Sequence, residues 1–255
     1  MRGLVLSIFP GIGMLDMAFE EAGFSVVRGP DLLWGGDVRR FTVPAGRFDG
    51  VIGGPPCKAF SRMRHIIEAG GKRLAPDLIP EYSRVVREAA PAWYLMENVP
   101  DAPEPDTPGY DARSFVLAHR HVGGTTLRRR RFTFGTHGRP APSLRTYVEF
   151  APLEPAEMHR AVTCDGREVP VKIGGSGQVK ATRNRPAVGG GPPPGNGLAM
   201  PFEEMCRRSD LPADFLSDAP FTVSGKREVV GNGVPLKMGR AVAAAVCRYL
   251  DSLAA

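Results

Sequence analysis

The sequence has no run of apolar residues approaching the roughly 20 that a membrane helix needs, and its N-terminus shows no signal-peptide pattern. Its four cysteines, Cys57, Cys164, Cys206 and Cys247, are scattered without a Cys-x-x-Cys pair. This spacing argues against a zinc site and against a disulfide framework. We therefore expect a cytoplasmic protein, and a cysteine with a special role should act chemically.

Two common nucleotide-binding motifs are also missing. No Gly-x-x-x-x-Gly-Lys-Ser/Thr motif occurs, and the glycine turn around Gly11 and Gly13 has Asp16 where a dinucleotide enzyme has its third glycine. NAD and ATP are therefore disfavoured. His119 and His121 have no third ligand at a suitable spacing, so no metal is expected.

The bulk composition suits a globular protein. With 255 residues and 42% hydrophobic residues, the chain can bury one sizeable core and at most a smaller second lobe. Its net charge of +6 and pI near 9.4 are compatible with a partner that carries phosphates, although many basic proteins bind no nucleic acid.

Strand-like and helix-like segments alternate along the first part of the chain. This pattern is typical of a mostly parallel α/β sheet with helices on both faces, which binds ligands at the carboxyl ends of its strands. Between Gly135 and Gly197 it gives way to Pro and Gly, which indicates a small loop-rich lobe. Predicted strands cover 4–9, 25–27, 48–52 and 93–96, and predicted helices cover 15–22, 81–90 and 236–250.

The turn Phe9-Pro10-Gly11-Ile12-Gly13 joins the first strand to the first helix. Its glycines let the backbone approach a ligand at a helix N-terminus. Asp31 ends the next strand, where an acidic group reaches ribose hydroxyls in nucleotide-binding folds. A solvated Asp at a strand end explains this residue equally well.

The segment Gly53-Gly54-Pro55-Pro56-Cys57 ends a strand in rigid prolines and presents a thiol at the ligand-binding edge. Lys58 and Arg62 provide positive charge that favours the reactive thiolate. Glu97 ends the strand at 93–96 and brings a carboxyl to the same edge. A nucleophile and a proton-handling acid should therefore face one pocket.

These motifs, in this order, resemble the cytosine-C5 DNA methyltransferase family over nearly the whole chain. Pro56-Cys57 with Phe60-Ser61, and Glu97-Asn98-Val99, are similar to its catalytic signatures. The resemblance implies a Rossmann-like S-adenosylmethionine-dependent methyltransferase fold in 1–138 and 218–255, with a target-recognition domain in 139–217. It also implies a compact bacterial or phage enzyme, found in the cytoplasm of a bacterial or phage-infected cell and serving restriction-modification, phage protection or regulation.

The resemblance implies S-adenosylmethionine as the cofactor and S-adenosylhomocysteine as its product. Asp31 would bind the ribose, Asp37 would lie near the adenine amino group, and Asn232 falls in a motif similar to the family's last cofactor motif. Leu32 stands where an aromatic residue often stacks on adenine. The implied cofactor site comprises Phe9, Gly11, Gly13, Asp31, Asp37, Pro55, Asn232 and Val234.

The family's Gln-x-Arg-x-Arg element aligns with residues 127–131, although Leu127 replaces the Gln and Lys58 replaces another usual Gln. Arg129 and Arg131 would then be the paired arginines, and Arg131 would contact the cytosine O2. Alternation along a strand sends both side chains to one face. A nonspecific basic patch remains the alternative.

The implied reaction begins with addition of Cys57 to cytosine C6, assisted by Glu97 at N3 and Arg131 at O2. The partner is duplex DNA with the target base flipped out, and the enzyme is expected to be a monomer. The small recognition lobe predicts a site of two to four base pairs. The predicted DNA-binding residues are Ser61, Arg62, Arg64, Lys72, Arg73, Lys180, Arg183 and Arg185.

Two other functions fit the same residues. A tRNA cytosine-C5 methyltransferase would keep the chemistry and change the substrate. A non-catalytic DNA-binding protein would keep only the fold, and the presence of Cys57, Glu97 and Arg131 argues against it.

Overall fold

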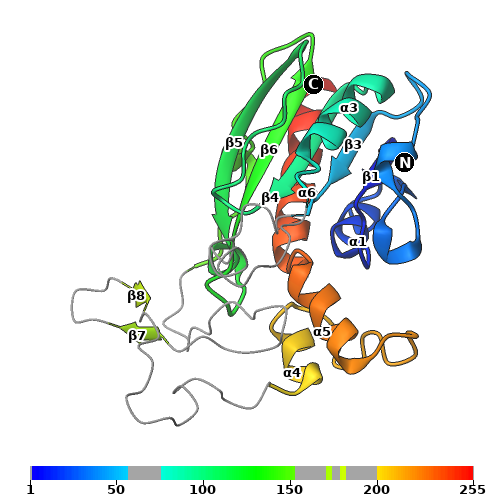
Figure 1. Cartoon of the computed structure of the whole chain (residues 1–255). Helices are drawn as coiled ribbons and strands as arrows, with labels where there is room; N and C mark the ends of the chain where they lie inside the picture. The colour runs from blue at the N-terminus through cyan, green and yellow to red at the C-terminus, as the bar shows by residue number, and fades with distance from the viewer. Residues whose placement is uncertain (1, 57–75, 153–170, 174–178, 182–199, 255) are drawn as a thin grey trace.

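The computed structural model describes residues 2–56, 76–152, 171–173, 179–181 and 200–254. Its main feature is a six-stranded sheet with helices on both faces (Figure 1). The strands are β1 Leu4–Ile8, β2 Ser25–Arg28, β3 Gly50–Gly53, β4 Trp93–Asn98, β5 Tyr110–Ala118 and β6 Arg129–His137. The α-helices are α1 Met14–Glu21, α3 Ile79–Ala89, α4 Phe202–Arg207, α5 Val223–Asn232 and α6 Leu236–Ala254.

The sheet has the strand order β2-β1-β3-β4-β6-β5. Strands β1, β2, β3 and β4 pair in parallel, whereas β6 is antiparallel to both β4 and β5. From β1 the chain first adds β2 on one side and then β3 on the other. This reversal leaves a crevice at the carboxyl ends of β1 and β3, where open α/β sheets bind their ligands.

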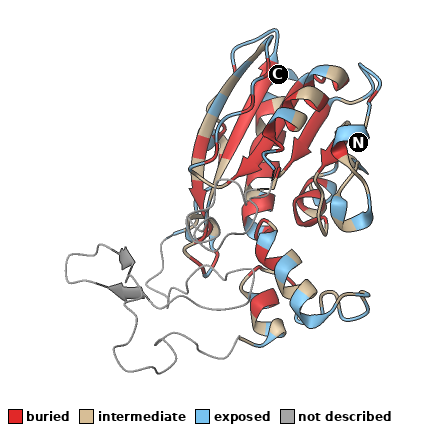
Figure 2. Ribbon diagram, in the orientation of Figure 1, coloured by how far each residue is buried: buried red, intermediate tan, exposed pale blue. Residues whose placement is uncertain are grey.

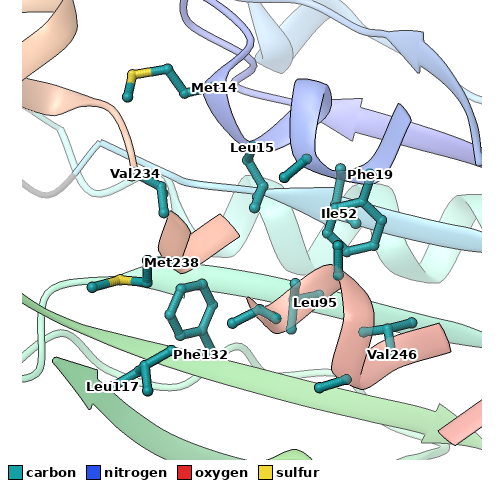
Figure 3. Close-up of a cluster of buried hydrophobic side chains, with 14 of the residues drawn as sticks. Met14, Leu15, Phe19, Ile52, Leu95, Leu117, Phe132, Val234, Met238 and Val246 are labelled. Atoms are coloured by element: carbon teal, nitrogen blue, oxygen red, sulfur yellow. The ribbon is translucent and has the colours of Figure 1, made fainter. Parts of the chain in front are cut away.

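Two apolar layers hold the helices against the sheet, whose strands are largely buried (Figure 2). One layer joins α1 and α6 to one face, and it contains Leu95 and Phe132 from the sheet (Figure 3). The other layer joins α3 to the opposite face through Tyr82, Val85 and Val86. Alternate residues along each strand therefore belong to different layers.

Helices α1 and α6 pack closely because the residues that face each other are small. A Cβ atom on Gly239 of α6 would lie 3.0 Å from the Cβ of Ala18 in α1. Leu15, Ala18 and Phe19 form one buried face of α1. The turn before α1 is thereby fixed to the C-terminal helix.

The remaining elements connect these layers and extend beyond one end of the sheet, where α4 and α5 lie (Figure 1). Short 3-10 turns are η1 Leu32–Trp34, η2 Val38–Arg40, η4 His119–Val122 and η5 Leu144–Tyr147. Strands β7 Val171–Ile173 and β8 Val179–Ala181 form a separate antiparallel pair. No helix in the described parts of the chain is long and apolar enough to span a bilayer.

The predicted α/β sheet is confirmed, and each predicted strand and helix corresponds to an element of the structure. Strands β5, β7 and β8 and helices α4 and α5 were not predicted. β5 is an edge strand, and only its second half is well buried. α5 contains Gly225 and Gly231, which disfavour helix, but the Thr222 side chain accepts a hydrogen bond from the Gly225 amide at 3.1 Å and caps its N-terminus.

Phe134 tests the layer that holds α6 on the sheet. Its ring is fully buried between Trp93 and Tyr249, with centroids 6.0 and 5.5 Å away. We expect Phe134→Ala to lower the free energy of unfolding by about 3–5 kcal/mol, because it leaves a cavity there. Urea denaturation measures this, with Val27→Ala on the exposed side of β2 as the control. Equal losses in the two variants would contradict the assignment.

Candidate functional site

A cavity of about 550 Å³ opens at the carboxyl ends of β1, β3 and β4, where the strand order reverses. Its walls come from the turn after β1, from η1, from the ends of β3 and β4, from β6 and from α5. This volume lies within the range of small-molecule sites in proteins. The polar side chains that line it include Ser7, Asp16, Asp31, Glu97, Asn98, Arg130, Glu228 and Asn232.

The turn after β1 has a backbone that glycine favours. Gly11 and Gly13 have φ of 57° and 79°, and Phe9 adopts φ of 58°, which is uncommon for a non-glycine residue. Asp31 holds this turn from the end of β2, because its Oδ2 accepts a hydrogen bond from the Gly11 amide at 2.8 Å. Its Oδ1 accepts from the Leu33 amide, also at 2.8 Å. The carboxylate is thus fixed at the cavity wall.

Asp16 is buried in the first turn of α1, beside the cavity. The Ser7 hydroxyl donates a hydrogen bond to its Oδ1 at 2.5 Å, and Arg28 donates to its Oδ2 at 3.0 Å. Burial raises the pKa of Asp16, whereas the contacts with Ser7 and Arg28 lower it. Where a dinucleotide motif has a glycine, this chain therefore has a buried carboxyl that joins β1, α1 and β2.

Glu97 occupies the end of β4 and is 7% exposed. Its Oε1 lies 2.7 Å from Nε of Arg130 in an ion pair. Burial raises the pKa of Glu97, and the charges of Arg130 and Arg128 only partly oppose this. A Cβ atom on Gly54 would lie 2.8 Å from Glu97 Oε2, so the chain after β3 approaches the carboxyl closely.

Arg128, immediately before β6, joins this strand to the C-terminal end of α5, which forms part of the cavity wall. It is 8% exposed, and its Nη2 donates hydrogen bonds to the carbonyls of Asn232 at 3.4 Å and Gly233 at 2.9 Å. These carbonyls lie at the C-terminal end of α5, where a cation is favourable. Arg130 thus contacts the end of β4 on one side of the cavity, and Arg128 contacts the end of α5 on the other.

Arg129 and Arg131 face away from Glu97. In the register of β4 and β6, Glu97 pairs with Phe132, whereas Asn98 pairs with Arg131. Because side chains alternate, Arg130 and Phe132 share the face of Glu97, and Arg129 and Arg131 lie on the other face. The expectation that Arg129 and Arg131 share a face is met, but Arg130 is the arginine that meets Glu97.

The predicted cofactor residues largely converge on the cavity. Gly13 is the N-terminal cap of α1. Asp37 is not among the lining residues, and its carboxylate forms an ion pair with Arg39 at 2.7 Å. The hydrogen bonds and the charge of Arg39 lower the pKa of Asp37. The predicted residues that line the cavity are Phe9, Gly11, Asp31, Pro55, Asn232 and Val234.

Several predicted residues lie outside the described part of the chain. Pro56, the last described residue before Cys57, lines the cavity. Lys180 falls in β8, opposite Lys172 of β7. The predicted residues outside the described ranges are Cys57, Ser61, Arg62, Arg64, Lys72, Arg73, Arg183 and Arg185.

His119 links two loops of the fold through both of its ring nitrogens. Its ring nitrogens lie 2.8 Å from Oγ1 of Thr126 and 2.6 Å from Oδ2 of Asp210, so it ties η4 to the loop after α4. Within the residues that the structure describes, no group of His, Cys, Asp and Glu side chains could hold a metal ion.

Several residues of the cavity wall were not predicted from the sequence, among them Asp16, Arg130, Phe221 and Glu228, and neither was the contact of Arg128 with the end of α5. Alternation along the strand separated the arginines into two pairs, but it did not say which pair faces Glu97. Gly225, Glu228, Val229 and Asn232 recur at helical spacing, and this pattern could have identified the cavity face of α5.

The sheet and its helices have the Rossmann-like fold of solved methyltransferases. The chain superimposes on the S. pombe Dnmt2 methyltransferase with a TM-score of 0.61 and 13% identity, over 99% of both chains. It superimposes on a putative DNA modification methyltransferase encoded within an E. coli prophage with a TM-score of 0.55 and 15% identity, over 97% of this chain and 99% of that one. At these identities the likeness concerns the fold.

The sequence relationship is more specific. Residues 35–139 match the family model of the C-5 cytosine-specific DNA methylase, which confirms the resemblance seen in the motifs. The chain is 30% identical to the Type II methyltransferase M.NgoPII of Neisseria gonorrhoeae over 140 residues, which are 47% of this chain and 36% of that protein. It is 34% identical to M.AquIA of Picosynechococcus over 129 residues, which are 39% and 49% of the two chains. The chain thus matches a third to a half of these relatives.

The raised pKa of Glu97 predicts how stability depends on pH. The folded protein holds this proton more tightly than the unfolded chain, whose carboxyl has a value near 4.5. The stability that Glu97 contributes through this proton is complete below the pKa of the unfolded chain. It is lost as pH rises through the pKa of the folded protein. Between about pH 4 and pH 8, we expect the free energy of unfolding of the wild type to fall relative to Glu97→Gln.

Urea denaturation at a series of pH values measures this difference. Glu149→Gln is the matched control, because the Glu149 side chain is 85% exposed. Wild type and Glu97→Gln with parallel pH profiles would show that burial does not shift the pKa of this carboxyl.

Proposed function

We propose that this protein is a DNA (cytosine-5-)-methyltransferase that forms a covalent adduct between Cys57 and C6 of a flipped-out cytosine. The observation that best supports this proposal is the buried Glu97 carboxyl, which is paired with Arg130 at 2.7 Å at the cavity. Pro55 and Pro56, immediately before Cys57, line the same cavity. A nucleophile, an acid and a guanidinium are the groups that this reaction requires.

S-adenosylmethionine fits the charges of the cavity. Asp16, Asp31 and Glu228 contribute carboxyl groups to the described lining, whereas the Glu97 carboxyl is paired with Arg130. An acidic lining favours a ligand with a sulfonium and an ammonium group. We propose that Asp31 binds the ribose hydroxyls and that Phe9, Gly11, Gly13, Pro55, Asn232 and Val234 form the rest of the site. When bound, the cofactor supplies an electrophilic methyl group.

The side chains of the protein prepare the cytosine ring. The Cys57 thiolate adds to C6, and its electron pair forms the new C–S bond. The C5–C6 π bond breaks, its electrons form a C4–C5 double bond, and the C4–N3 π electrons move onto N3, so that C5 becomes nucleophilic. Burial raises the pKa of Glu97 and so favours the protonated carboxyl, which can donate to N3. Once C5 carries the methyl group, loss of the C5 proton restores the double bond and expels the thiolate.

We propose that Arg130 takes the role that the motif alignment gave to Arg131. Its guanidinium is on the face of Glu97 and lines the cavity, and its side chain is only 14% exposed. There it can offset negative charge that develops on the cytosine O2. Arg129, which is exposed on the opposite face, suits a contact outside the cavity.

We infer the same division of the chain that the motifs suggested. All described residues that line the cavity lie within 1–138 and 218–255, which supports these segments as the catalytic and cofactor domain. Residues 139–217 would then recognise a short DNA sequence. Flipping the target base costs a few kcal/mol, which DNA contacts must supply. Ser61, Arg62, Arg64, Lys72, Arg73, Lys180, Arg183 and Arg185 are the candidates for those contacts.

A restriction-modification role is part of this proposal, because the relatives compared above are Type II methyltransferases. We propose duplex DNA as the substrate and the monomer as the active form. A tRNA substrate would require the same cysteine and acid, so a direct comparison of the two nucleic acids decides between them.

Cys57 provides the first test of the proposal. We expect Cys57→Ala to abolish methylation of plasmid DNA in expressing cells, because no adduct can form at C6. Bisulfite sequencing reads the modified cytosines and their context. Cys247→Ala, which changes a buried cysteine of α6, is the control and should retain activity. A Cys57→Ala protein that still methylates cytosine would refute the mechanism, and methylation of tRNA in place of DNA would change the substrate.

The neighbouring arginines provide the second test. We expect Arg130→Ala to lower kcat by about 10²–10³-fold, because it removes the charge next to Glu97, whereas Arg131→Ala should retain kcat within about tenfold. Single-turnover methylation of duplex DNA measures both, with circular dichroism to establish folding. The opposite ranking would restore Arg131 to the catalytic role.

A further inference from the structure

An aromatic pair joins two distant parts of the chain at the cavity. Trp34 belongs to η1 after Asp31, and Phe221 immediately precedes the cap of α5. Their ring centroids are 5.5 Å apart with an interplanar angle of 52°. Phe221 is among the residues that line the cavity.

Trp34 is held in place although its side chain is largely exposed. Its indole Nε1 donates a hydrogen bond to the Gly11 carbonyl at 2.7 Å, and its amide donates to the Asp31 carbonyl at 3.0 Å. The residue is nevertheless 59% exposed. An exposed indole that is fixed to the glycine turn provides a rigid aromatic support for whatever packs beside it.

Phe221 is positioned from the other side by α5. Thr222 caps this helix, so the residue before it leaves the helix at a defined place. Gly225, Val229 and Asn232 follow on the face of α5 that lines the cavity. The phenyl ring therefore extends the cavity wall from α5 toward η1, where it meets Trp34.

The 3-10 turn η1 gives the cavity an apolar wall through Leu32 and Leu33. Leu32 lines the cavity and is 63% exposed, so a ligand in the cavity can contact its side chain. The Asp31 carboxylate lies next to it, held by the Gly11 and Leu33 amides. A nucleoside whose ribose meets Asp31 would direct its base toward these side chains.

We propose that Phe221, supported by Trp34, contacts the face of the adenine ring of the cofactor. This inference rests on the proposed function and adds a cofactor-binding residue from the segment before α5, outside the part that matches the family model. Because Leu32 has no aromatic ring, Phe221 supplies the ring contact from the segment before α5. Aromatic stacking of this kind changes affinity by about tenfold or less, beyond the contribution of buried area.

Binding of S-adenosylhomocysteine by isothermal titration calorimetry tests the proposal. We expect Phe221→Ala to raise Kd by about tenfold, Phe221→Leu to raise it by less, and Phe221→Tyr to bind like the wild type. Val223→Ala is the matched control, since Val223 is two residues away, 61% exposed and absent from the cavity wall. Adenosine, used as a competitor, should lose affinity by the same factor as the full ligand.

Tryptophan fluorescence gives a second measurement. The two tryptophans are Trp34 and Trp93, and Trp93 is 2% exposed in the core. We expect S-adenosylhomocysteine to change the emission of the wild type, and this change should be absent in Trp34→Phe. Phe221→Ala with a Kd within twofold of wild type would overturn the adenine contact and leave the proposed function intact. A wild type that binds no S-adenosylhomocysteine would overturn both.

Discussion

The buried ion pair between Glu97 and Arg130 is the contact on which the site depends. A carboxyl at 7% exposure is expensive to ionise, and a guanidinium at 2.7 Å compensates for only part of that cost. The carboxyl consequently retains its proton to a higher pH than an exposed glutamate. This balance gives the proposed reaction an acid, and it exists only while β4 and β6 hold their register. A shift of one residue would move Arg130 to the other layer.

Strand β6, with the residue that precedes it, connects the two sides of the cavity. Arg130 contacts Glu97 at the end of β4, and Arg128 donates to the carbonyls at the end of α5. α5 contributes Val229 and Asn232 to the proposed cofactor site, and α6 then returns across the sheet to pack on α1. The glycine turn, the acid and the C-terminal helices are thus mechanically linked, although they are far apart in the sequence.

Prediction from the sequence succeeded where one local signal was strong. The β1 strand, the Phe9–Gly13 turn and α1 follow from an apolar run, two glycines and helical spacing. It did not find β5, because the first half of this edge strand contains no buried residue and so has no clear apolar pattern. It also missed α5, whose glycines oppose helix formation, while the Thr222 cap and packing against the cavity favour it.

The sequence by itself determined the order of the motifs, the glycine turn with Asp31, and the carboxyl of Glu97 at a strand end. It also determined that Arg129 and Arg131 share one face of a strand while Arg128 and Arg130 share the other. Only the tertiary structure decided which pair meets Glu97, because that depends on the pairing of β6 with β4. Likewise, only the fold brings Phe221 beside Trp34, since no local pattern relates residues that contact one another across the cavity.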